Sequence, residues 1–466
     1  MMNPFQKACR YAVGLFAAFA LTTHVASAWD ASAFEAEALG DVKDLKPLLI
    51  VRITTVYGCH LGLVNPGVAP GLMSVMVDAK PDAEYEGILN RTPVFSSNGK
   101  HFAYGARKGE QWFVVADGKA GPKWDMILEG SLIFSEEGQH LAYVAKKGRQ
   151  WFVVIDDKIS APYDEISCLP MLSQDGQHVV YGAQNKKRQF MVFDENPGPE
   201  YDYAVSVNIS PDGKRVAHAA QQDSKQFVVV DGQSSPNYGG IFCESLQFSA
   251  DGKHVAYAAE RGVDRFVVVD GKNGPNFEGV VKNSLRLSRD GSRVAFVVRK
   301  GEKLIPMIDG KAGPEYDKAE PAMFSENGDH VAYLAGTEAE RFVVVDGKAQ
   351  SDFEEIAKNT LVMSSDGMRV AYGALKNGKY KMVIDGKTSG EYDAVGVPSF
   401  SPDGKHVTYR AGKNEQAIVF VDGDEVPNYI GLVCEPVFRK DGVLEFMTAE
   451  KGILYRITSK AFLPTP

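Results

Sequence analysis

Short hydrophobic runs separated by polar turns repeat along most of the chain at a nearly constant interval. The stretch FSPDGKHVTY (400–409) is typical: two apolar runs flank a turn whose Asp-Gly pair supplies the conformations of a tight hairpin. In an equivalent run, Val255 and Tyr257 face one way and Ala256 the other, because side chains alternate across a strand. The pattern therefore predicts paired strands with bulky residues on one face and small residues on the other.

Three sequence markers recur in phase. The turn glycine occurs in ten copies spaced by 37 to 39 residues, at Gly99, Gly138, Gly176, Gly213, Gly252, Gly291, Gly328, Gly367, Gly404 and Gly442. Runs of the VVVDGK type place an aspartate at Asp78, Asp117, Asp156, Asp194, Asp231, Asp270, Asp309, Asp346, Asp385 and Asp422. An aromatic residue follows each aspartate by seven positions. Such a period indicates a supersecondary unit that buries its faces only against its neighbours.

Every signal inside the repeat is typical of a strand. RFVVVDGKNGPNF (265–277) contains a β-branched run, an Asp-Gly turn and an extended exit; with the hairpin before it, this makes about four short strands, the content of one propeller blade. We therefore predict an all-β chain that forms a β-propeller of about ten four-stranded repeats of about 38 residues in one continuous array.

The number of repeats leaves the assembly open, because propellers typically have about four to eight blades. Two smaller tandem propellers and an open, curved stack are the alternatives. The constant spacing favours one continuous array, since two propellers would need a linker or an interrupted repeat. We also expect N-terminal strands to complete the last repeat, because edge strands need partners.

The repeats also resemble those of a known family. FSPDGKHVTY (400–409), NISPDGKRVAH (208–218) and QFSADGKHVAY (247–257) are similar to the repeat of TolB-type, WD-repeat-like bacterial propellers, over roughly Met73 to Ser459. The resemblance implies a propeller fold and a periplasmic location. It implies no activity, because the motif describes turns and packing positions, and the chain does not match the separate N-terminal domain of TolB itself.

The first 28 residues have the pattern of a secretory signal peptide. Lys7 and Arg10 precede the apolar run YAVGLFAAFAL (11–21), and the sequence ending at Ala28 offers an A-x-A cleavage site. The run is shorter than the roughly 20 residues that cross a bilayer. We therefore predict cleavage after Ala28, a periplasmic or secreted chain, and no membrane span after cleavage.

The remainder divides into three parts. Residues 29–72 form an N-terminal extension, in which 30–45 has helix-like composition and 46–57 has strand character. Residues 73–459 form the propeller repeats, and residues 460–466 form a C-terminal tail.

Charge narrows the range of partners. The chain has 51 basic and 60 acidic residues and a net charge of -9. Nucleic-acid binding needs clustered basic charge, and the sequence has no basic run of useful length, so we expect no nucleic-acid partner. A protein or a cell-envelope component is the expected partner.

Cysteine offers a candidate covalent link. Cys168, Cys243 and Cys434 occupy the same place in three repeats that are not adjacent. A disulfide needs Cα atoms within about 7 Å, so we expect these three to be small buried residues. Cys59 lies outside the repeats and could bond to Cys434 if the two ends of the chain meet.

A histidine or arginine follows nine of the turn glycines by two positions. We expect each of these side chains to cap the neighbouring hairpin through a hydrogen bond. No metal site is predicted, since zinc needs three or four converging ligands and the VVVDGK aspartates do not fit a calcium-binding loop. No cofactor is predicted either.

Departures from the repeat are the remaining candidates for a binding site, because function on a symmetric scaffold concentrates where symmetry breaks. They are His218, Glu195, Asn196, His60, Trp112 and Trp151. His218 replaces a recurrent tyrosine, Glu195 and Asn196 replace the Gly-Lys of a turn, and His60 lies outside the repeats. The two tryptophans are equivalent residues of adjacent repeats and would anchor a partner if exposed.

No catalytic residues are predicted, because the chain contains no G-x-S-x-G elbow, P-loop or H-E-x-x-H motif. We expect an exported, non-catalytic β-propeller that serves as a binding scaffold for a protein or an envelope polymer through its loops. The alternative is a glycan-acting hydrolase or lyase with an axial pocket, which would need two carboxyl groups roughly 5 to 9.5 Å apart.

Overall fold

The computed structural model describes residues 33–42, 49–55, 58–67, 71–350, 353–414, 416–426, 429 and 431–460. The predicted signal peptide and nearly all of the predicted C-terminal tail lie outside these residues. All named elements in the described ranges are β-strands, which confirms the all-β prediction. No helix in this part of the chain is long and apolar enough to cross a membrane.

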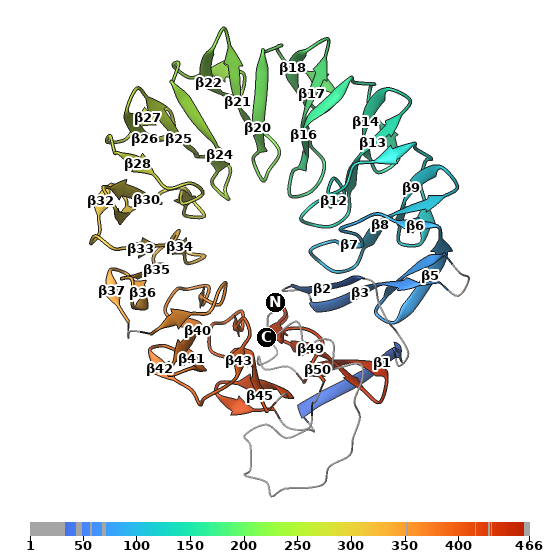
Figure 1. Ribbon diagram of the computed structural model, residues 1–466, viewed down its shortest axis with the longest axis vertical. Helices are drawn as coiled ribbons and strands as arrows, with labels where there is room; N and C mark the ends of the chain where they lie inside the picture. The colour runs from blue at the N-terminus through green and yellow to red at the C-terminus, as the bar shows by residue number, and fades with distance from the viewer. Residues whose placement is uncertain are drawn as a thin grey trace, which may run out of the picture. The chain divides into compact units, whose positions relative to one another are not determined.

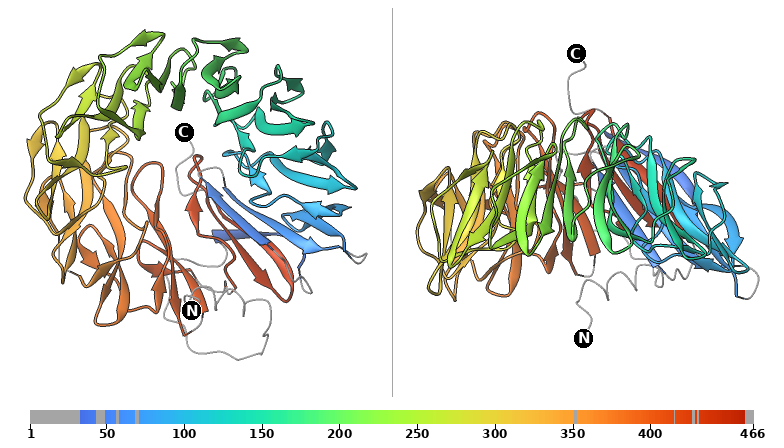
Figure 2. Two further views of the ribbon diagram at one scale, coloured as in Figure 1. Left: turned by 45° about the horizontal axis from the view of Figure 1, so that its top comes forward. Right: turned by 90° about the horizontal axis from the view of Figure 1, so that it is seen from above.

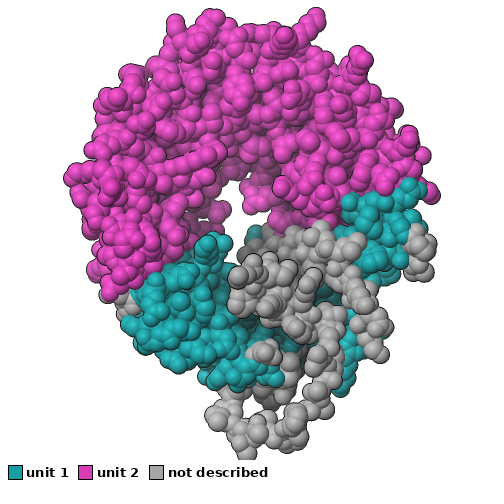
Figure 3. Space-filling model, in the orientation of Figure 1, with its two compact units in different colours: residues 1–88, 353–466 teal, residues 89–352 magenta. Residues whose placement is uncertain are grey.

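The described strands pair into eleven antiparallel sheets, which belong to two compact units (Figure 3). Unit 1 comprises residues 1–88 and 353–466, and unit 2 comprises residues 89–352. Seven sheets have their central strands in unit 2 and four have theirs in unit 1.

Each sheet is built on two long central strands that form a hairpin. In unit 2 these are β8 (Phe102–Lys108) and β9 (Gln111–Ala116), β13 (Leu141–Lys147) and β14 (Gln150–Ile155), β17 (Val179–Asn185) and β18 (Arg188–Phe193), β21 (Val216–Gln222) and β22 (Lys225–Val230), β25 (Val255–Arg261) and β26 (Asp264–Val269), β30 (Val294–Lys300) and β31 (Lys303–Ile308), and β35 (Val331–Gly336) and β36 (Arg341–Val345). In unit 1 they are β3 (Gly58–Pro66) and β4 (Met73–Val77), β40 (Val370–Lys376) and β41 (Lys379–Ile384), β45 (Val407–Lys413) and β46 (Gln416–Val421), and β49 (Leu444–Glu450) and β50 (Ile453–Ser459).

The outer strands are mostly two residues long. The longer ones are β1 (Phe34–Asp41), β2 (Leu49–Thr55), β5 (Lys80–Tyr85), β16 (Glu165–Leu172), β20 (Tyr203–Ile209) and β24 (Gly240–Phe248). The short strands before the central hairpins are β6 (Gly87–Ile88), β7 (Val94–Phe95), β11 (Met126–Ile127), β12 (Ile133–Phe134), β28 (Gly279–Val280), β29 (Arg286–Leu287), β33 (Lys318–Ala319), β34 (Met323–Phe324), β38 (Glu355–Ile356), β39 (Val362–Met363), β43 (Ala394–Val395), β44 (Ser399–Phe400) and β48 (Val437–Phe438). The short strands after them are β10 (Lys119–Ala120), β15 (Lys158–Ile159), β19 (Asn196–Pro197), β23 (Gln233–Ser234), β27 (Lys272–Asn273), β32 (Lys311–Ala312), β37 (Lys348–Ala349), β42 (Lys387–Thr388) and β47 (Asp424–Glu425).

Within unit 2 the sheets follow one another in chain order along a curve (Figure 1). The first strands, such as β16, β20 and β24, lie on the concave side, and the fourth strands, such as β27 and β32, lie on the convex side (Figure 1). Each first strand pairs only with the second strand of its own sheet. The concave side of unit 2 therefore presents a row of sheet edges.

Neighbouring sheets pack bulky residues against small ones, as the sequence predicts. Tyr257 of β25 is 2% exposed and lies in one apolar cluster with Ala217 of the preceding sheet. On the opposite face of β25, Ala256 and Ala258 cluster with Phe296 of the following sheet. Each sheet therefore depends on both neighbours to bury its faces, which is the packing expected of propeller blades.

The N-terminal region differs from the sequence prediction in two respects. The stretch expected to be helical contains strand β1, which pairs along its length with β50. Its alanine and glutamate content favours a helix, but Phe34 is buried against Phe446, with ring centroids 6.0 Å apart, and this packing overrides the local propensity. The prediction that an N-terminal strand completes the last repeat is confirmed.

The second difference is the number of sheets. Strands β2 and β3 precede the first repeat recognised in the sequence and pair with β4 and β5, giving the described residues an eleventh sheet in place of about ten. This sheet has no turn glycine of the repeat type, so alignment on that glycine does not count it.

Candidate binding surface

The recurrent histidines and arginines pair with the VVVDGK aspartates of their own sheets. In ten sheets the imidazole Nδ1 or guanidinium Nε lies 2.6 to 2.9 Å from the aspartate Oδ2. The other oxygen, as in Asp270, accepts the backbone N–H of the residue after the histidine, here Val255 at 3.0 Å. The predicted capping role is therefore confirmed, and these aspartates close the sheet's two turns on each other.

His60 belongs to this set, although the sequence analysis placed it outside the repeats. Its Nδ1 lies 2.8 Å from Asp78 Oδ2, as in the other sheets. Burial raises the pKa of Asp78, but the hydrogen bonds from His60 and the Leu61 N–H and the charge of Arg456 outweigh it and lower that pKa below its ordinary value. His60 is thus a capping residue of the β2–β5 sheet.

The same side chains also reach the next sheet. Arg215 Nη1 donates to the Lys253 carbonyl at 2.5 Å, and its guanidinium carbon lies 5.3 Å from the centroid of the Phe248 ring. His140 Nε2 lies 2.9 Å from Gln177 Nε2, and its ring lies against the turn glycine Gly176. The turn glycine therefore serves two needs, a left-handed backbone and room for the neighbouring ring.

Replacing Gly176 with alanine is expected to lower the free energy of unfolding by about 1 to 3 kcal/mol. Its φ is +75°, and an added Cβ would lie 2.6 Å from His140 Cδ2. Gly148→Ala is the matched control, because Gly148 has φ +62° but open space around its Cβ position. Urea unfolding should show the larger loss for Gly176→Ala. Equal losses would mean that the histidine contact contributes nothing.

His218 is a buried core residue of β21. It is 7% exposed, its ring centroid lies 5.5 Å from that of Tyr201, and neither ring nitrogen has a hydrogen-bond partner among the described residues. In the adjacent sheet, the equivalent Tyr257 hydroxyl lies 3.1 Å from that of Tyr238. Burial lowers the pKa of His218 to about 4, so its imidazole is neutral at physiological pH.

Glu195 and Asn196 occupy an exposed turn and a short outer strand. Asn196 Nδ2 donates to the Asp194 carbonyl at 2.9 Å, and Glu195 adopts a φ of 67° in the turn. Their local roles are those of a turn. The structure therefore does not bring these residues together with His218 into one site.

Trp112 and Trp151 are half-buried rather than exposed. Both pack at the borders of apolar clusters, and each has a cation over its ring, Arg107 at 5.9 Å and Lys146 at 5.0 Å from the centroid. Packing between sheets accounts for the positions of both.

The predicted bond between Cys59 and Cys434 is absent: all four described cysteines are free thiols. Cys59 and Cys434 do share one buried cluster in unit 1, so the proximity expected from the sequence is present. Each sulfur is engaged with the backbone. Cys59 Sγ lies 3.5 Å from the Glu435 carbonyl oxygen, and the Met447 N–H points to Cys434 Sγ at 3.2 Å.

A buried ion network in unit 1 was missed by sequence reasoning. Glu445 is 3% exposed and accepts the Cys59 N–H at 2.7 Å, Arg439 Nη1 at 3.2 Å and Arg456 Nε at 3.4 Å. Arg456 Nη2 also donates to Asp78 at 2.9 Å. The network joins the β49–β50 hairpin to the β2–β5 sheet, and each of its residues looks ordinary in the sequence.

Symmetry breaks most clearly at β16. In four other sheets the first strand is interrupted by a turn that a hydroxyl closes, as Ser131 does by donating to the Leu128 carbonyl at 2.7 Å. At the equivalent position β16 has Leu169, the strand runs on for 8 residues, and Leu169 is 43% exposed. Met171, two residues further, is 36% exposed. A leucine in a column of serines and threonines was the sequence signal for this site.

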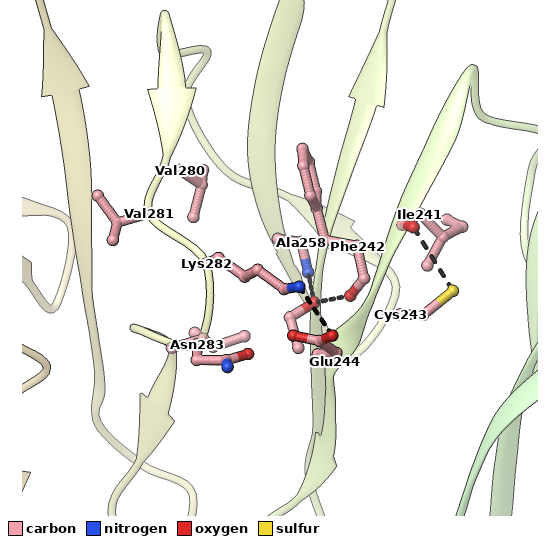
Figure 4. Close-up of a pocket in the computed structure, with 11 residues that line it drawn as sticks. Ile241, Phe242, Cys243, Glu244, Ala258, Val280, Val281, Lys282 and Asn283 are labelled. Carbon is pink, nitrogen blue, oxygen red and sulfur yellow. Dashed lines mark hydrogen bonds and ion pairs between the residues drawn. The ribbon is translucent and has the colours of Figure 1, made fainter.

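Close by along the same side, a pocket of about 380 Å³ lies between β24 and the segment that follows β28 (Figure 4). Its wall is mostly apolar, with Phe242, Val280 and Leu285 among the lining residues. Glu244 and Lys282 form an ion pair of 2.8 Å at the pocket (Figure 4). Three or more residues that could hold a metal ion do not cluster anywhere in the described part of the chain.

Comparisons with known proteins agree with this picture at the level of the fold. No family model matches the chain, and neither does any curated protein. Similar solved structures include a eukaryotic initiation factor (12% identity, 93% of this chain and 99% of that chain, TM-score 0.41). They also include TolB from Acinetobacter baumannii (14%, 56% and 77%, 0.27) and the Cps50 (Swd1) β-propeller domain of Myceliophteria thermophila (15%, 56% and 96%, 0.25).

The stacked four-stranded sheets define the chain as a multi-blade β-propeller. Its resemblance to TolB and to other propeller domains lies in the repeat and the fold.

Proposed function

We propose that the protein is an exported, non-catalytic scaffold that binds an apolar segment of a partner protein along the concave side of unit 2. The observation that carries the proposal is the pair of exposed apolar side chains on β16, Leu169 and Met171, at a strand edge where other sheets place capped turns. The apolar pocket beside β24 lies in the same row of strands. The residues of the signal-peptide pattern support export.

The pocket also bears on the alternative of a glycan-acting hydrolase or lyase. Glycoside hydrolysis needs two carboxyl groups across the bond that is cleaved. The residues lining this pocket include one carboxylate, Glu244, which is ion-paired with Lys282. This composition favours binding over hydrolysis.

The test places a photo-crosslinking amino acid at Met171 of the full-length chain in its native host, with the same residue at Val263 as the control. Val263 is 83% exposed on a hairpin of unit 2 and lies outside the proposed surface. One defined protein should be crosslinked from position 171 and not from 263. The purified partner should then bind Leu169→Asp/Met171→Asp about 10- to 100-fold more weakly than wild type. Crosslinks that do not differ between the positions, or unchanged affinity, would overturn the proposal.

A further inference from the structure

Two adjacent hairpins of unit 2 concentrate positive charge on this acidic protein. The tips of the β13–β14 and β17–β18 hairpins read KKGRQ (146–150) and QNKKR (184–188), with six basic residues and no acidic one. Lys147, Arg149, Lys186 and Lys187, which we call the basic tips, are all exposed. Of the six basic residues, only Arg188 takes part in an ion pair among the described residues, with Glu200 and Asp202.

The two hairpins belong to sheets that pack directly on each other. Val144 and Val153 of one sheet share an apolar cluster with Tyr181 and Phe190 of the next. The sheets of unit 2 stand side by side in Figure 2, so equivalent hairpins emerge at the same edge. Packed sheets lie about 10 Å apart, which is within a Debye length of about 8 Å to 10 Å at physiological salt or slightly beyond it, so the charges act on one ligand together.

The acidic residues beneath the tips are engaged with the backbone. Asp125 Oδ2 accepts the Gly148 N–H at 2.7 Å, and Asp164 Oδ2 accepts the Lys186 N–H at 2.9 Å. Equivalent hairpins elsewhere have their lysines paired: Lys300 with Glu315 at 2.8 Å and Lys379 with Asp393 at 2.6 Å. The basic tips therefore differ from other hairpins in having cations that no side chain neutralises.

The backbone of the β17–β18 turn is also unusual. Lys186 and Lys187 have φ values of 49° and 70°, a geometry that strongly favours Asn-Gly in two-residue hairpins. The equivalent turn between β40 and β41 has that preferred pair, Asn377 and Gly378. Two lysines thus occupy positions where they are poor turn formers.

We propose that the basic tips bind an anionic glycan, a polysaccharide bearing carboxylate or phosphate groups. A linear polyanion can contact both tips at once, which single surface anions cannot. The tips carry no apolar residue to insert into a lipid surface, and Lys146 covers the ring of Trp151, which single-stranded nucleic acid would need for stacking. This site is separate from the concave surface, so the inference stands independently of the proposed function.

The test uses the full-length chain and polygalacturonate as the probe, with neutral dextran as its uncharged counterpart. The variant Lys147→Ala/Arg149→Ala/Lys186→Asn/Lys187→Gly removes four positive charges and installs the preferred turn. It should keep or raise the melting temperature while weakening polygalacturonate binding by about 100-fold or more. Wild-type affinity should fall steeply with added salt, and the variant should show a shallower dependence.

The matched control, Lys300→Ala/Lys303→Ala/Lys379→Ala/Lys413→Ala, also removes four positive charges, three of them from ion-paired lysines. It should bind polygalacturonate within about threefold of wild type. Equal weakening in both variants would show an effect of net charge and overturn the site. The proposal also fails if wild type binds a DNA duplex or vesicles containing phosphatidylglycerol more tightly than polygalacturonate, or if it does not bind polygalacturonate.

Discussion

Acidification from about pH 6.5 to about pH 4 should cost the wild-type protein about 3 kcal/mol more stability than a His218→Tyr variant. The folded pKa of His218 is lowered to about 4 from an ordinary value of 6.5. Between these values the unfolded chain binds a proton that the folded chain excludes, so stability falls as the pH falls. The loss is complete below the folded pKa and absent above the ordinary one.

Tyrosine is the informative replacement because the fold already holds it at the equivalent positions. There the hydroxyl lies 3.1 Å from that of a second tyrosine, as Tyr181 does from Tyr163. At neutral pH the variant should therefore gain about 1 kcal/mol from the new hydrogen bond to Tyr201. Its advantage should widen as the pH falls.

Urea unfolding of both proteins at a series of pH values measures the difference directly. The other histidines and carboxylates titrate in both proteins and cancel in the comparison. His101→Gln serves as a control, because His101 is an exposed capping histidine and its loss should leave the difference between neutral and acidic pH nearly unchanged. Parallel stability curves for wild type and His218→Tyr would contradict the prediction.

Replacing Glu445 with alanine should destabilise unit 1 by about 3 kcal/mol or more. The carboxylate is 3% exposed and is held by two arginines and the Cys59 N–H. Removing it leaves Arg456, whose side chain is 19% exposed, without its buried partner. The penalty arises from the charge left behind rather than from the net value of the intact pair.

Glu445→Gln separates the two contributions to this loss. The amide oxygen can still accept the Cys59 N–H, so this variant should lose less stability than Glu445→Ala while still leaving the arginines without their counter-charge. Lys379→Ala, which breaks an exposed pair with Asp393, should change the urea midpoint far less. A Glu445→Ala midpoint close to that of Lys379→Ala would show that the network contributes little.

The sequence predicted those features that depend on contacts repeated in every sheet. Alternation of Tyr257 with Ala256 requires opposite faces of one strand, and the Asp-Gly pairs require turns, so strands, hairpins and stacked sheets all followed. The histidine caps were also predictable, because a repeated residue at a fixed distance from a turn has a repeated local partner. Periodicity made these contacts visible.

Contacts made only once were not predictable in this way. β1 has the composition of a helix and becomes a strand because β50, more than 400 residues later, offers it an edge. Glu445 and Arg456 come together with Asp78 only after the β49–β50 hairpin meets the β2–β5 sheet. His218, Glu195 and Asn196 stood out as irregularities, but a substitution in a repeat shows where a chain departs from its pattern and not which residues it then contacts.

The pairing of β1 with β50 sets an order on the life of the chain. Phe34 faces Ser459 in that sheet, so a segment synthesised near the start waits for one synthesised near the end. At about 5 to 20 residues per second, the delay amounts to roughly 20 to 90 seconds of translation. A product released early by the ribosome would leave β1 without its partner strand, so completion of this one sheet distinguishes a finished polypeptide from a truncated one.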